Sequence, residues 1–254
     1  MTRVLPPRVQ RVADLVVSQA GGYLRNTIRE HRVTCAVCAA PVDGYERCIP
    51  CSGHASSAHR TADRVASLVY AVEYDSQAYK LVRGYKADNP GPSLSDMMSS
   101  LLAIGLQGHG ACDAKLAGNP ADIGWAVVPS TRRPDRPQPL RVLLQALAKP
   151  GHEIVLAPSP NPVSVRELRP ENFLVVTPPP YRPHVILIDD SWVRGGHAQS
   201  AAAALKLAGV ADVSILTVAR VLNPDWAPNV EFIRVRLGGW YDPSICPWTG
   251  GACP

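Results

Sequence analysis

The sequence contains no long apolar run and few charged residues. Its longest apolar runs, such as residues 185–188, are far shorter than the ~18 residues that cross a bilayer, so no membrane span is predicted. Charged residues make up 19% of the chain, which is too few for a disordered tail or a coiled coil. Internal repeats and low-complexity tracts are also missing. At 254 residues, the chain is long enough to bury a real hydrophobic core in one large or two small domains.

Lysine is scarce, and no secretory segment is seen. Only five of the 26 basic residues are lysine, as expected from a GC-rich coding sequence, and the N-terminus carries no apolar signal segment. We therefore expect a bacterial, cytoplasmic protein that does not associate with a membrane. In that setting seven cysteines, an odd number, do not indicate a disulfide framework.

Four of the cysteines form two Cys-x-x-Cys pairs, Cys35 with Cys38 and Cys48 with Cys51, and nine residues separate the pairs. Each pair aims two thiolates at one point, and two such pairs complete a tetrahedral zinc shell with Zn–S distances near ~2.3 Å. Four thiolates leave no open position, so the zinc would be structural and its binding would supply folding energy. A redox dithiol is the alternative for a single pair, and the tandem arrangement disfavours it.

The remaining cysteines, Cys112, Cys246 and Cys253, are scattered and are interpreted as incidental. Six residues separate Cys246 from Cys253, and that pair alone is not expected to form a second metal site. His54 and His59 follow the zinc module closely. They are either outer-shell groups of the metal or, as we favour, ordinary linker histidines.

Nearly all of the net charge of +5 lies in the first quarter of the chain. Residues 1–60 contain eight arginines against four acidic residues, whereas the other 194 residues contain 18 bases and 17 acids. A cationic surface attracts phosphate backbones without sequence specificity. Contact with nucleic acid is therefore one interpretation of this region, and an arginine-rich solvated helix is the other.

Hydrophobic patterning predicts an α/β chain. Strands are predicted at residues 65–74 (or a hairpin arm there), 125–128, 173–176, 185–188, 213–218 and 230–235, and helices at 5–20, 23–32, 77–87, 93–107, 140–149 and 197–208. Irregular segments are predicted at 52–57, 129–139, 157–172 and 189–196. The chain then divides into a helical segment (1–32), a zinc ribbon (33–56), an α/β domain (60–237) and a tail (238–254). The aromatic, proline-rich tail either caps the sheet, which we favour, or docks on a partner.

Residues 185–197 carry the second chemical motif. An apolar strand leads into Asp189 and Asp190, which places both carboxylates at the carboxyl edge of a sheet, where α/β ligands bind. Gly195 and Gly196 let the backbone approach an anion, and the following helix offers free N–H groups and a favourable dipole. Carboxylates for ribose hydroxyls beside amides for a phosphate make a site for a ribose 5-phosphate group. A strand that ends in two solvated aspartates is the alternative.

This string resembles the PRPP-binding signature of type I phosphoribosyltransferases. Together with the cysteine module and residues 81–86 (Leu-Val-Arg-Gly-Tyr-Lys), it resembles the ComF-like branch, in which a zinc ribbon precedes the transferase domain. Residues 125–133 fit the place where such proteins have a strand that leads to the pyrophosphate-side loop. The likeness covers most of residues 33–220. The aspartate string and the cysteine tandem are specific, and the other two matches are weak alone.

The resemblance implies a Rossmann-like parallel sheet with a hood, the type I phosphoribosyltransferase fold, and a PRPP site assisted by Mg²⁺. It implies that Asp189 and Asp190 contact the ribose hydroxyls as the catalytic pair. The residues implied to wrap the 5-phosphate are Ser191, Trp192, Val193, Arg194, Gly195, Gly196 and His197, and those implied to face the pyrophosphate are Ser130 with Arg132 or Arg133.

The chain departs from the family pattern at Val193, Arg194 and His197, where the family usually carries threonines. Arg194 could replace the lost hydroxyl donors with a charge-assisted contact, or it could be a solvated loop arginine. A protonated His197 would oppose the helix dipole unless a phosphate is present, whereas a neutral one could still donate a hydrogen bond. No base-recognition motif follows residue 218.

Three functions are consistent with these residues, and whether the protein is an enzyme stays open. The first is a PRPP-dependent transferase that acts on a base or an amine, releases pyrophosphate and uses zinc structurally. The second is a non-catalytic module that binds PRPP or a nucleotide, while its basic zinc-bearing N-terminus contacts nucleic acid or a DNA-uptake or DNA-processing partner, as the ComF resemblance suggests. The third is an interaction protein that only retains the fold.

Overall fold

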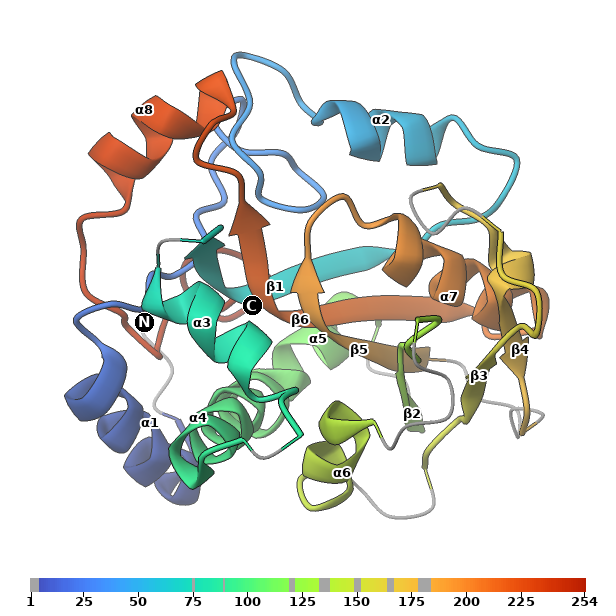
Figure 1. Cartoon of the computed structure of the whole chain (residues 1–254), viewed down its shortest axis with the longest axis horizontal. Coiled ribbons are helices and arrows are strands. Elements are labelled where there is room, and N and C mark those ends of the chain that lie inside the picture. The colour runs from blue at the N-terminus through green and yellow to red at the C-terminus, as the bar shows by residue number, and fades with distance from the viewer. Residues whose placement is uncertain are drawn as a thin grey trace.

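The computed structural model describes residues 5–74, 76–88, 90–118, 122–132, 138–148, 152–163, 167–177 and 184–254. At its centre is a four-stranded parallel sheet in the spatial order β1-β6-β5-β2 (Figure 1). The four strands are β1 (Arg64–Val72), β2 (Ile123–Val127), β5 (His184–Trp192) and β6 (Asp212–Leu222). Because the strands are parallel, their carboxyl ends meet at one edge, where α/β proteins bind ligands.

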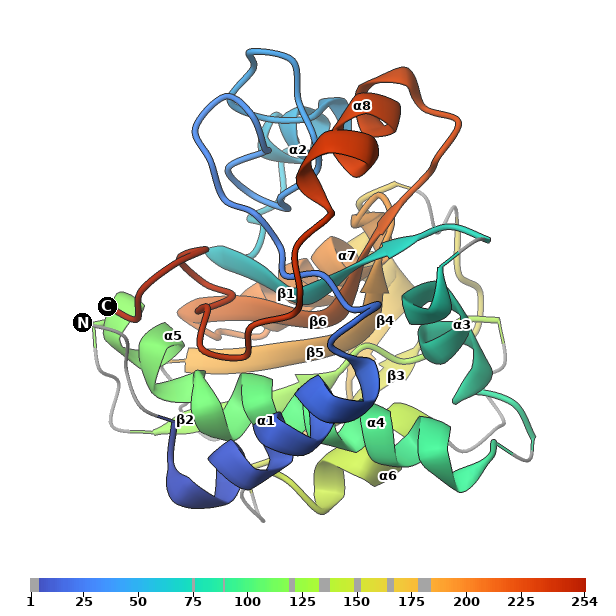
Figure 2. The ribbon, with the colours of Figure 1, turned by 90° about the vertical axis from the view of Figure 1, so that its left-hand side faces the viewer.

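Helices cover both faces of the sheet, as Figure 2 shows. One face carries α1 (Pro7–Ala20), α4 (Pro92–Ala103), α5 (Gly110–Leu116) and α6 (Pro139–Gln145), with a π-helical segment η1 (Ile104–Gly108) between α4 and α5. The other face carries α7 (Gly196–Leu207), over which lies α2 (Ile49–Ala55) of the cysteine module. Burial on both faces explains why β5 and β6 are nearly continuous apolar runs rather than alternating ones.

The shorter elements lie around this sandwich. They are α3 (Gln77–Gly84) after β1, α8 (Ala227–Arg236) after β6, the antiparallel pair β3 (Leu156–Pro158) and β4 (Phe173–Val175), and the 3-10 turn η2 (Pro170–Asn172). Among the described residues, none of the helices has the length and hydrophobicity needed to span a bilayer.

The predicted α/β class and its parallel sheet are confirmed. The strands expected at 65–74, 125–128, 173–176, 185–188 and 213–218 are present, as are the helices expected at 5–20, 77–87, 93–107, 140–149 and 197–208, with residue 149 outside the described part. β5 is longer than predicted, so that Asp189 and Asp190 belong to the strand, and the expected loop at 189–196 shrinks to residues 193–195. The expected linker at 52–57 is mostly helix α2, and the expected irregular segment at 157–172 contains part of β3.

The helix predicted at residues 23–32 is wrong. The segment is extended, and Asn26 forms an antiparallel bridge to Val69 of β1. The Thr27 hydroxyl donates to the Ser67 carbonyl at 2.7 Å, and the Tyr70 N–H donates to a carbonyl of the same segment. β1 is an edge strand whose outer backbone groups need partners. This segment provides those partners, and it is therefore extended rather than helical.

The strand predicted at residues 230–235 is also wrong, because these residues form helix α8. The buried face of α8 is narrow. Its buried residues are Asn229 and Phe232, three positions apart, whereas Val230 and Val235 are exposed. Phe232 packs edge-on against Tyr70, with 5.5 Å between ring centroids. A spacing of three residues is that of a helix face, and the apolar alternation in the sequence concealed it.

Candidate functional site

The carboxyl end of β5 brings together two segments that are far apart in the sequence. The Tyr85 hydroxyl donates to Asp190 Oδ2 at 2.9 Å, and Lys86 Nζ lies 2.5 Å from the same oxygen. The Ser191 hydroxyl donates to Asp190 Oδ1 at 2.7 Å. Tyr85 and Asp190 are buried, and Lys86 is partly exposed. Residues 81–86 and 185–197, noted separately in the sequence, therefore meet at one carboxylate.

Asp189 lies beside this group and has a different environment. Its Oδ1 accepts a hydrogen bond of 2.8 Å from the Asp190 backbone N–H. Burial raises the pKa of Asp189 well above its usual value, and the charge of Asp190 raises it further, although Lys86 opposes the rise. The pKa of Tyr85 is raised well above its usual value by burial and then by Asp190, so its hydroxyl stays a donor. The two adjacent aspartates are thus not equivalent.

Helix α7 begins at a turn that requires glycine. Gly195 has φ of +81°, and a Cβ there would lie 2.1 Å from Cζ2 of Trp192. The indole of Trp192 is buried beneath this turn and supports it, and the Trp192 and Val193 carbonyls accept hydrogen bonds from Arg220. Of the residues that sequence analysis placed around a phosphate, Trp192 therefore has a packed side chain, whereas Val193 is exposed.

His197, in the first turn of α7, joins the helix to the segment that follows β2. Its Nε2 lies 3.0 Å from the Pro129 carbonyl, which places the N–H donor on Nε2. The ring packs edge-on against Phe173 at 4.9 Å. Burial lowers the pKa of His197; the hydrogen bond to Pro129 and the charge of Asp190 oppose this shift, and the charges of Arg132 and Lys86 add to it. A neutral His197 does not oppose the helix dipole, which removes the conflict expected for a protonated one.

The remaining residues of the predicted phosphate and pyrophosphate sets lie at the surface. Arg194 is exposed in the turn before α7, and Ser130 and Arg132 are exposed after β2. The charges of Arg132 and Lys86 both act on His197 and lower its pKa. Arg133 lies outside the described residues.

The four cysteines of the tandem converge as predicted, and this cluster could form a zinc site. The sulfur atoms of Cys35, Cys38, Cys48 and Cys51 all lie within 4.8 Å of one another, and Cys38 and Cys48 are 3.7 Å apart. Tetrahedral coordination with Zn–S bonds of about 2.3 Å requires sulfur–sulfur distances of about 3.8 Å. The donor set and its spacing therefore fit the ion.

The cysteine cluster shares a hydrophobic core with helix α7. Cys35, Cys38 and Cys51 are buried in the same cluster as Ala201 and Ala202. Loss of a metal bound by these cysteines would therefore disturb the packing of α7. His54 is buried with its Nδ1 unpartnered by any described residue, and His59 is exposed.

A cavity of about 290 Å³ lies between the cysteine module and β1, away from Asp189 and Asp190. Its lining includes Arg47, His54 and Gln199. Asp189 and Asp190 do not line this cavity. Their side-chain contacts, and not an enclosed volume, mark the carboxyl edge of the sheet as a candidate site.

Two of the arginines that make the N-terminus basic are used by the fold. Arg25 donates to the Leu237 carbonyl at 2.5 Å. Arg29 donates to the carbonyls of Pro247 at 3.0 Å and Ala36 at 3.3 Å. The charge available to nucleic acid is therefore smaller than the residue count indicates.

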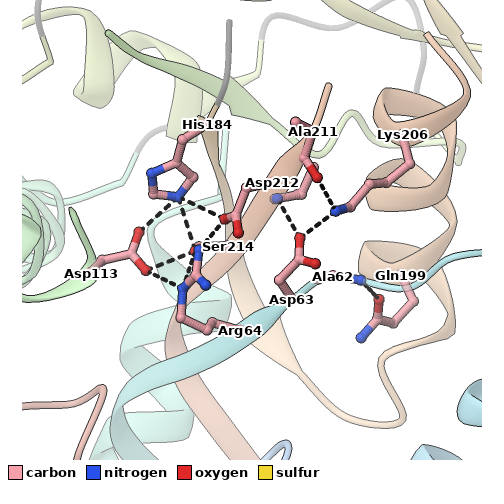
Figure 3. A network of polar contacts seen from close by, with 11 residues as sticks. Ala62, Asp63, Arg64, Asp113, His184, Gln199, Lys206, Ala211, Asp212 and Ser214 are labelled. Atoms are coloured by element: carbon pink, nitrogen blue, oxygen red, sulfur yellow. Dashed lines mark hydrogen bonds and ion pairs between the residues drawn. The ribbon is translucent and has the colours of Figure 1, made fainter. Parts of the chain in front are cut away.

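A buried polar network that the sequence did not reveal lies at the opposite, amino edge of the sheet (Figure 3). Arg64 donates to Asp113 Oδ1 at 3.0 Å and pairs with Asp212. His184 Nε2 lies 3.0 Å from the Ser214 hydroxyl and 3.1 Å from Asp113 Oδ2. One nitrogen of His184 thus faces both groups, unlike the relay of a hydrolytic triad, in which the two nitrogens face different partners. The network ties α5 to the first residues of three strands.

A smaller set of polar contacts lies beside this network and involves two residues of α7. Lys206 pairs with Asp63 and donates to the Ala211 carbonyl at 2.7 Å (Figure 3). Gln199 accepts a hydrogen bond of 2.8 Å from the Ala62 N–H. These contacts hold α7 to the chain that enters β1.

The other three cysteines were interpreted from the sequence as incidental, and this is wrong because they lie together in the fold. Cys112, Cys246 and Cys253 meet around His109, and the four donor atoms lie within 4.8 Å of one another. Spacing in the sequence could not reveal this, because the cluster joins α5 to the tail. The part of the chain that the structure describes therefore contains two clusters that could bind zinc.

A scan of the chain against protein-family models finds no match, and a search of curated proteins finds none either.

Proposed function

We propose that the carboxyl edge of the sheet binds a phosphorylated ribose, PRPP or a related nucleotide, in the manner of the ComF-like branch of type I phosphoribosyltransferases. The observation that carries this proposal is the contact of Tyr85 and Lys86 with Asp190. These residues come from two of the segments, 81–86 and 185–197, that together carry the resemblance to this branch. Their meeting at one carboxylate beside a helix N-terminus is what a sugar-phosphate site requires.

In this proposal the carboxylates hold the ribose. Tyr85, Lys86 and Ser191 hold the Asp190 carboxylate in one orientation. A carboxylate has about four acceptor positions, so Asp190 keeps capacity for a ribose hydroxyl.

The first turn of α7 holds the 5-phosphate. No side chain caps its N-terminus, so its backbone N–H groups and dipole can act on an anion. The turn at Gly195 presents these amides, and the exposed Arg194 adds a charged donor in place of the family's threonines. Lys86 and Arg132 face the more anionic pyrophosphate end of the ligand.

Mg²⁺ enters the proposal with PRPP. The strand edge offers carboxylate oxygens, which are the ligands that Mg²⁺ prefers. Both oxygens of Asp190 already accept hydrogen bonds from the protein, so Asp189 is the residue that would hold the ion together with the pyrophosphate. The ion supplies charge neutralisation for the leaving group.

Transfer would break the bond between ribose C1 and pyrophosphate and form a bond from C1 to a nitrogen of a base or amine, which loses its proton to solvent. The chain's part is to neutralise the leaving group, through Lys86 and Arg132, and to exclude water. A non-catalytic binding module is the second candidate. It is favoured by the loss of hydroxyl donors at Val193 and Arg194, which weakens the grip on the phosphate.

Calorimetry with PRPP and Mg²⁺ tests the binding proposal. We expect the natural chain to bind PRPP and Asp190→Asn to lose at least tenfold in affinity, whereas Asp96→Asn on the exposed side of α4 keeps it. Equal binding by Asp190→Asn would remove the site assignment.

Incubation with PRPP, Mg²⁺ and a panel of bases and amines then separates the two candidates. Release of pyrophosphate with one acceptor identifies a transferase. Binding of PRPP without release in any mixture identifies the non-catalytic module.

A further inference from the structure

Four metal-binding side chains meet on the helical face that carries α1 and α5, far from the cysteine tandem. His109 immediately precedes α5 and Cys112 lies in its first turn, whereas Cys246 and Cys253 belong to the tail. The first three are almost fully buried, and Cys253 is partly buried.

The distances fit tetrahedral coordination of one ion. His109 Nδ1 lies 3.5 Å from Cys253 Sγ and 4.0 Å from Cys112 Sγ. Bonds of about 2.3 Å to sulfur and 2.0 Å to nitrogen, at tetrahedral angles, give nitrogen–sulfur distances of about 3.5 Å. All four donor atoms lie within 4.8 Å of one another. The centre of the group therefore has the size of a zinc site.

The hydrogen bond on the far side of the His109 ring prepares Nδ1 as a ligand. Nε2 lies 3.0 Å from the Pro243 carbonyl, an oxygen that can only accept. Nε2 therefore carries the proton and Nδ1 carries the lone pair. Histidines that bind metals almost always donate their other N–H to a carbonyl or carboxylate in this way.

The tail is folded so that its two cysteines face the same point. The Cys246 N–H donates to the Gly251 carbonyl, and the Gly250 N–H donates back to the Cys246 carbonyl, both at 2.8 Å. Gly250 has φ of +77°, and a Cβ there would lie 2.6 Å from Cβ of Arg29. The loop thus needs glycine to close, and its closure brings Cys253 back toward Cys246.

We propose that His109, Cys112, Cys246 and Cys253 bind a second zinc ion. Three thiolates and one imidazole are a donor set typical of structural zinc, and four protein ligands leave no open position for substrate. With this site, all seven cysteines of the chain have a ligand role. The proposed zinc site does not depend on the proposed sugar-phosphate site, and either proposal can fail without affecting the other.

The second zinc fastens the tail to the fold. Tyr241 and Trp248 of the tail are buried in the same core as α1 and α4. Lys115 of α5 donates to the Pro254 carbonyl at 2.9 Å, beside Cys253. Without the metal, the tail would keep these contacts but would hold three crowded thiols at its centre.

Metal analysis of the full chain, purified without chelator, tests the proposal. Native mass spectrometry and elemental analysis are expected to find two zinc ions in the natural chain. Cys253→Ser is expected to retain one, Cys48→Ser in the tandem to retain the other, and the double variant to retain none. Ser244→Ala, in the same tail but not a ligand, is expected to keep both.

A second readout covers the case in which Cys253→Ser fails to fold. In the natural chain, alkylation of Cys112, Cys246 and Cys253 should be slow and should become at least tenfold faster when a chelator removes the metal. One zinc per chain that Cys253→Ser leaves unchanged would overturn the proposal. So would a mass 2 Da below that of the reduced chain together with peptide mapping that places the disulfide in this cluster.

Discussion

Lys86 Nζ lies 2.5 Å from Asp190 Oδ2, so the lysine that follows α3 neutralises a carboxylate at the end of β5. This pair links the segment after the first strand of the sheet to the strand that leads into α7. A ligand phosphate at the helix would meet the ammonium group before it meets the carboxylate. The Lys86–Asp190 pair therefore determines the local charge near an anionic ligand bound at this edge.

Replacement of Lys86 by methionine should weaken PRPP binding at least tenfold. The change keeps most of the side-chain length but leaves Asp190 without its cation, and the uncompensated carboxylate then repels the phosphate groups. Lys80→Met, on the exposed side of α3, should bind PRPP as the natural chain does. Calorimetry with both variants checks this, and equal affinities would contradict the role of the pair.

Replacement of Asp189 by asparagine should stabilise the protein at neutral pH while it weakens PRPP binding. Burial raises the pKa of Asp189 in the folded chain, so the folded state holds a proton that the unfolded state has already lost. Stability is therefore lost as pH rises from about 4, the usual aspartate value, through the raised pKa. Each unit of that rise corresponds to about 1.4 kcal/mol.

Thermal melting from pH 4 to pH 8 measures this effect. The melting temperature of the natural chain should fall more steeply over the range than that of Asp189→Asn, and Asp96→Asn should follow the natural chain. Parallel curves for all three proteins would show that the Asp189 charge costs the fold nothing.

Replacement of Gly195 by alanine should destabilise the protein and weaken PRPP binding. The substitution meets both a positive φ and a clash, because its Cβ would lie 2.1 Å from the Trp192 ring. Gly209→Ala is the matched control, with φ of +97° and no atom within 4 Å of the added Cβ. The left-handed conformation alone costs about 1–2 kcal/mol.

Chemical denaturation separates the two contributions. Gly195→Ala should lose at least about 1 kcal/mol more than Gly209→Ala, because a clash with a packed ring adds to the backbone strain. Similar losses in the two variants would mean that the indole shifts freely and does not support the turn.

The parts of the fold that local pattern determines could be predicted from the sequence. The four cysteines of the tandem lie within a short stretch, and their spacing alone indicated the cluster that the structure shows. The second cluster could not be found in this way, since His109 and Cys253 are 144 positions apart. Only the packing of the tail on α5 brings them together.

The two wrong elements have the same kind of cause. Residues 23–32 have a helical pattern, but they satisfy the outer backbone groups of β1, such as the N–H of Tyr70. Residues 230–235 alternate like a strand, but the buried apolar position among them is Phe232, which packs with Tyr70 and Leu222. Both segments adopt the structure that lets them contact the edge strand β1. The local sequence of a segment does not show which contacts β1 requires. The contact between Lys86 and Asp190 was likewise out of reach of periodicity, because the two residues belong to segments that are far apart in the sequence.

The strand order has a consequence for how the chain folds. β6 lies between β1 and β5, yet it is the last of the four strands in the chain. During synthesis β1 therefore waits without its sheet partner until residues 212–222 emerge from the ribosome, and such non-local pairing makes folding slow. The cysteine tandem, in contrast, is complete early and could fold around a zinc ion while the rest of the chain is still being made. The order of emergence thus favours a nascent chain with a finished N-terminal module and an open sheet, the state in which the edge of β1 is most exposed to aggregation.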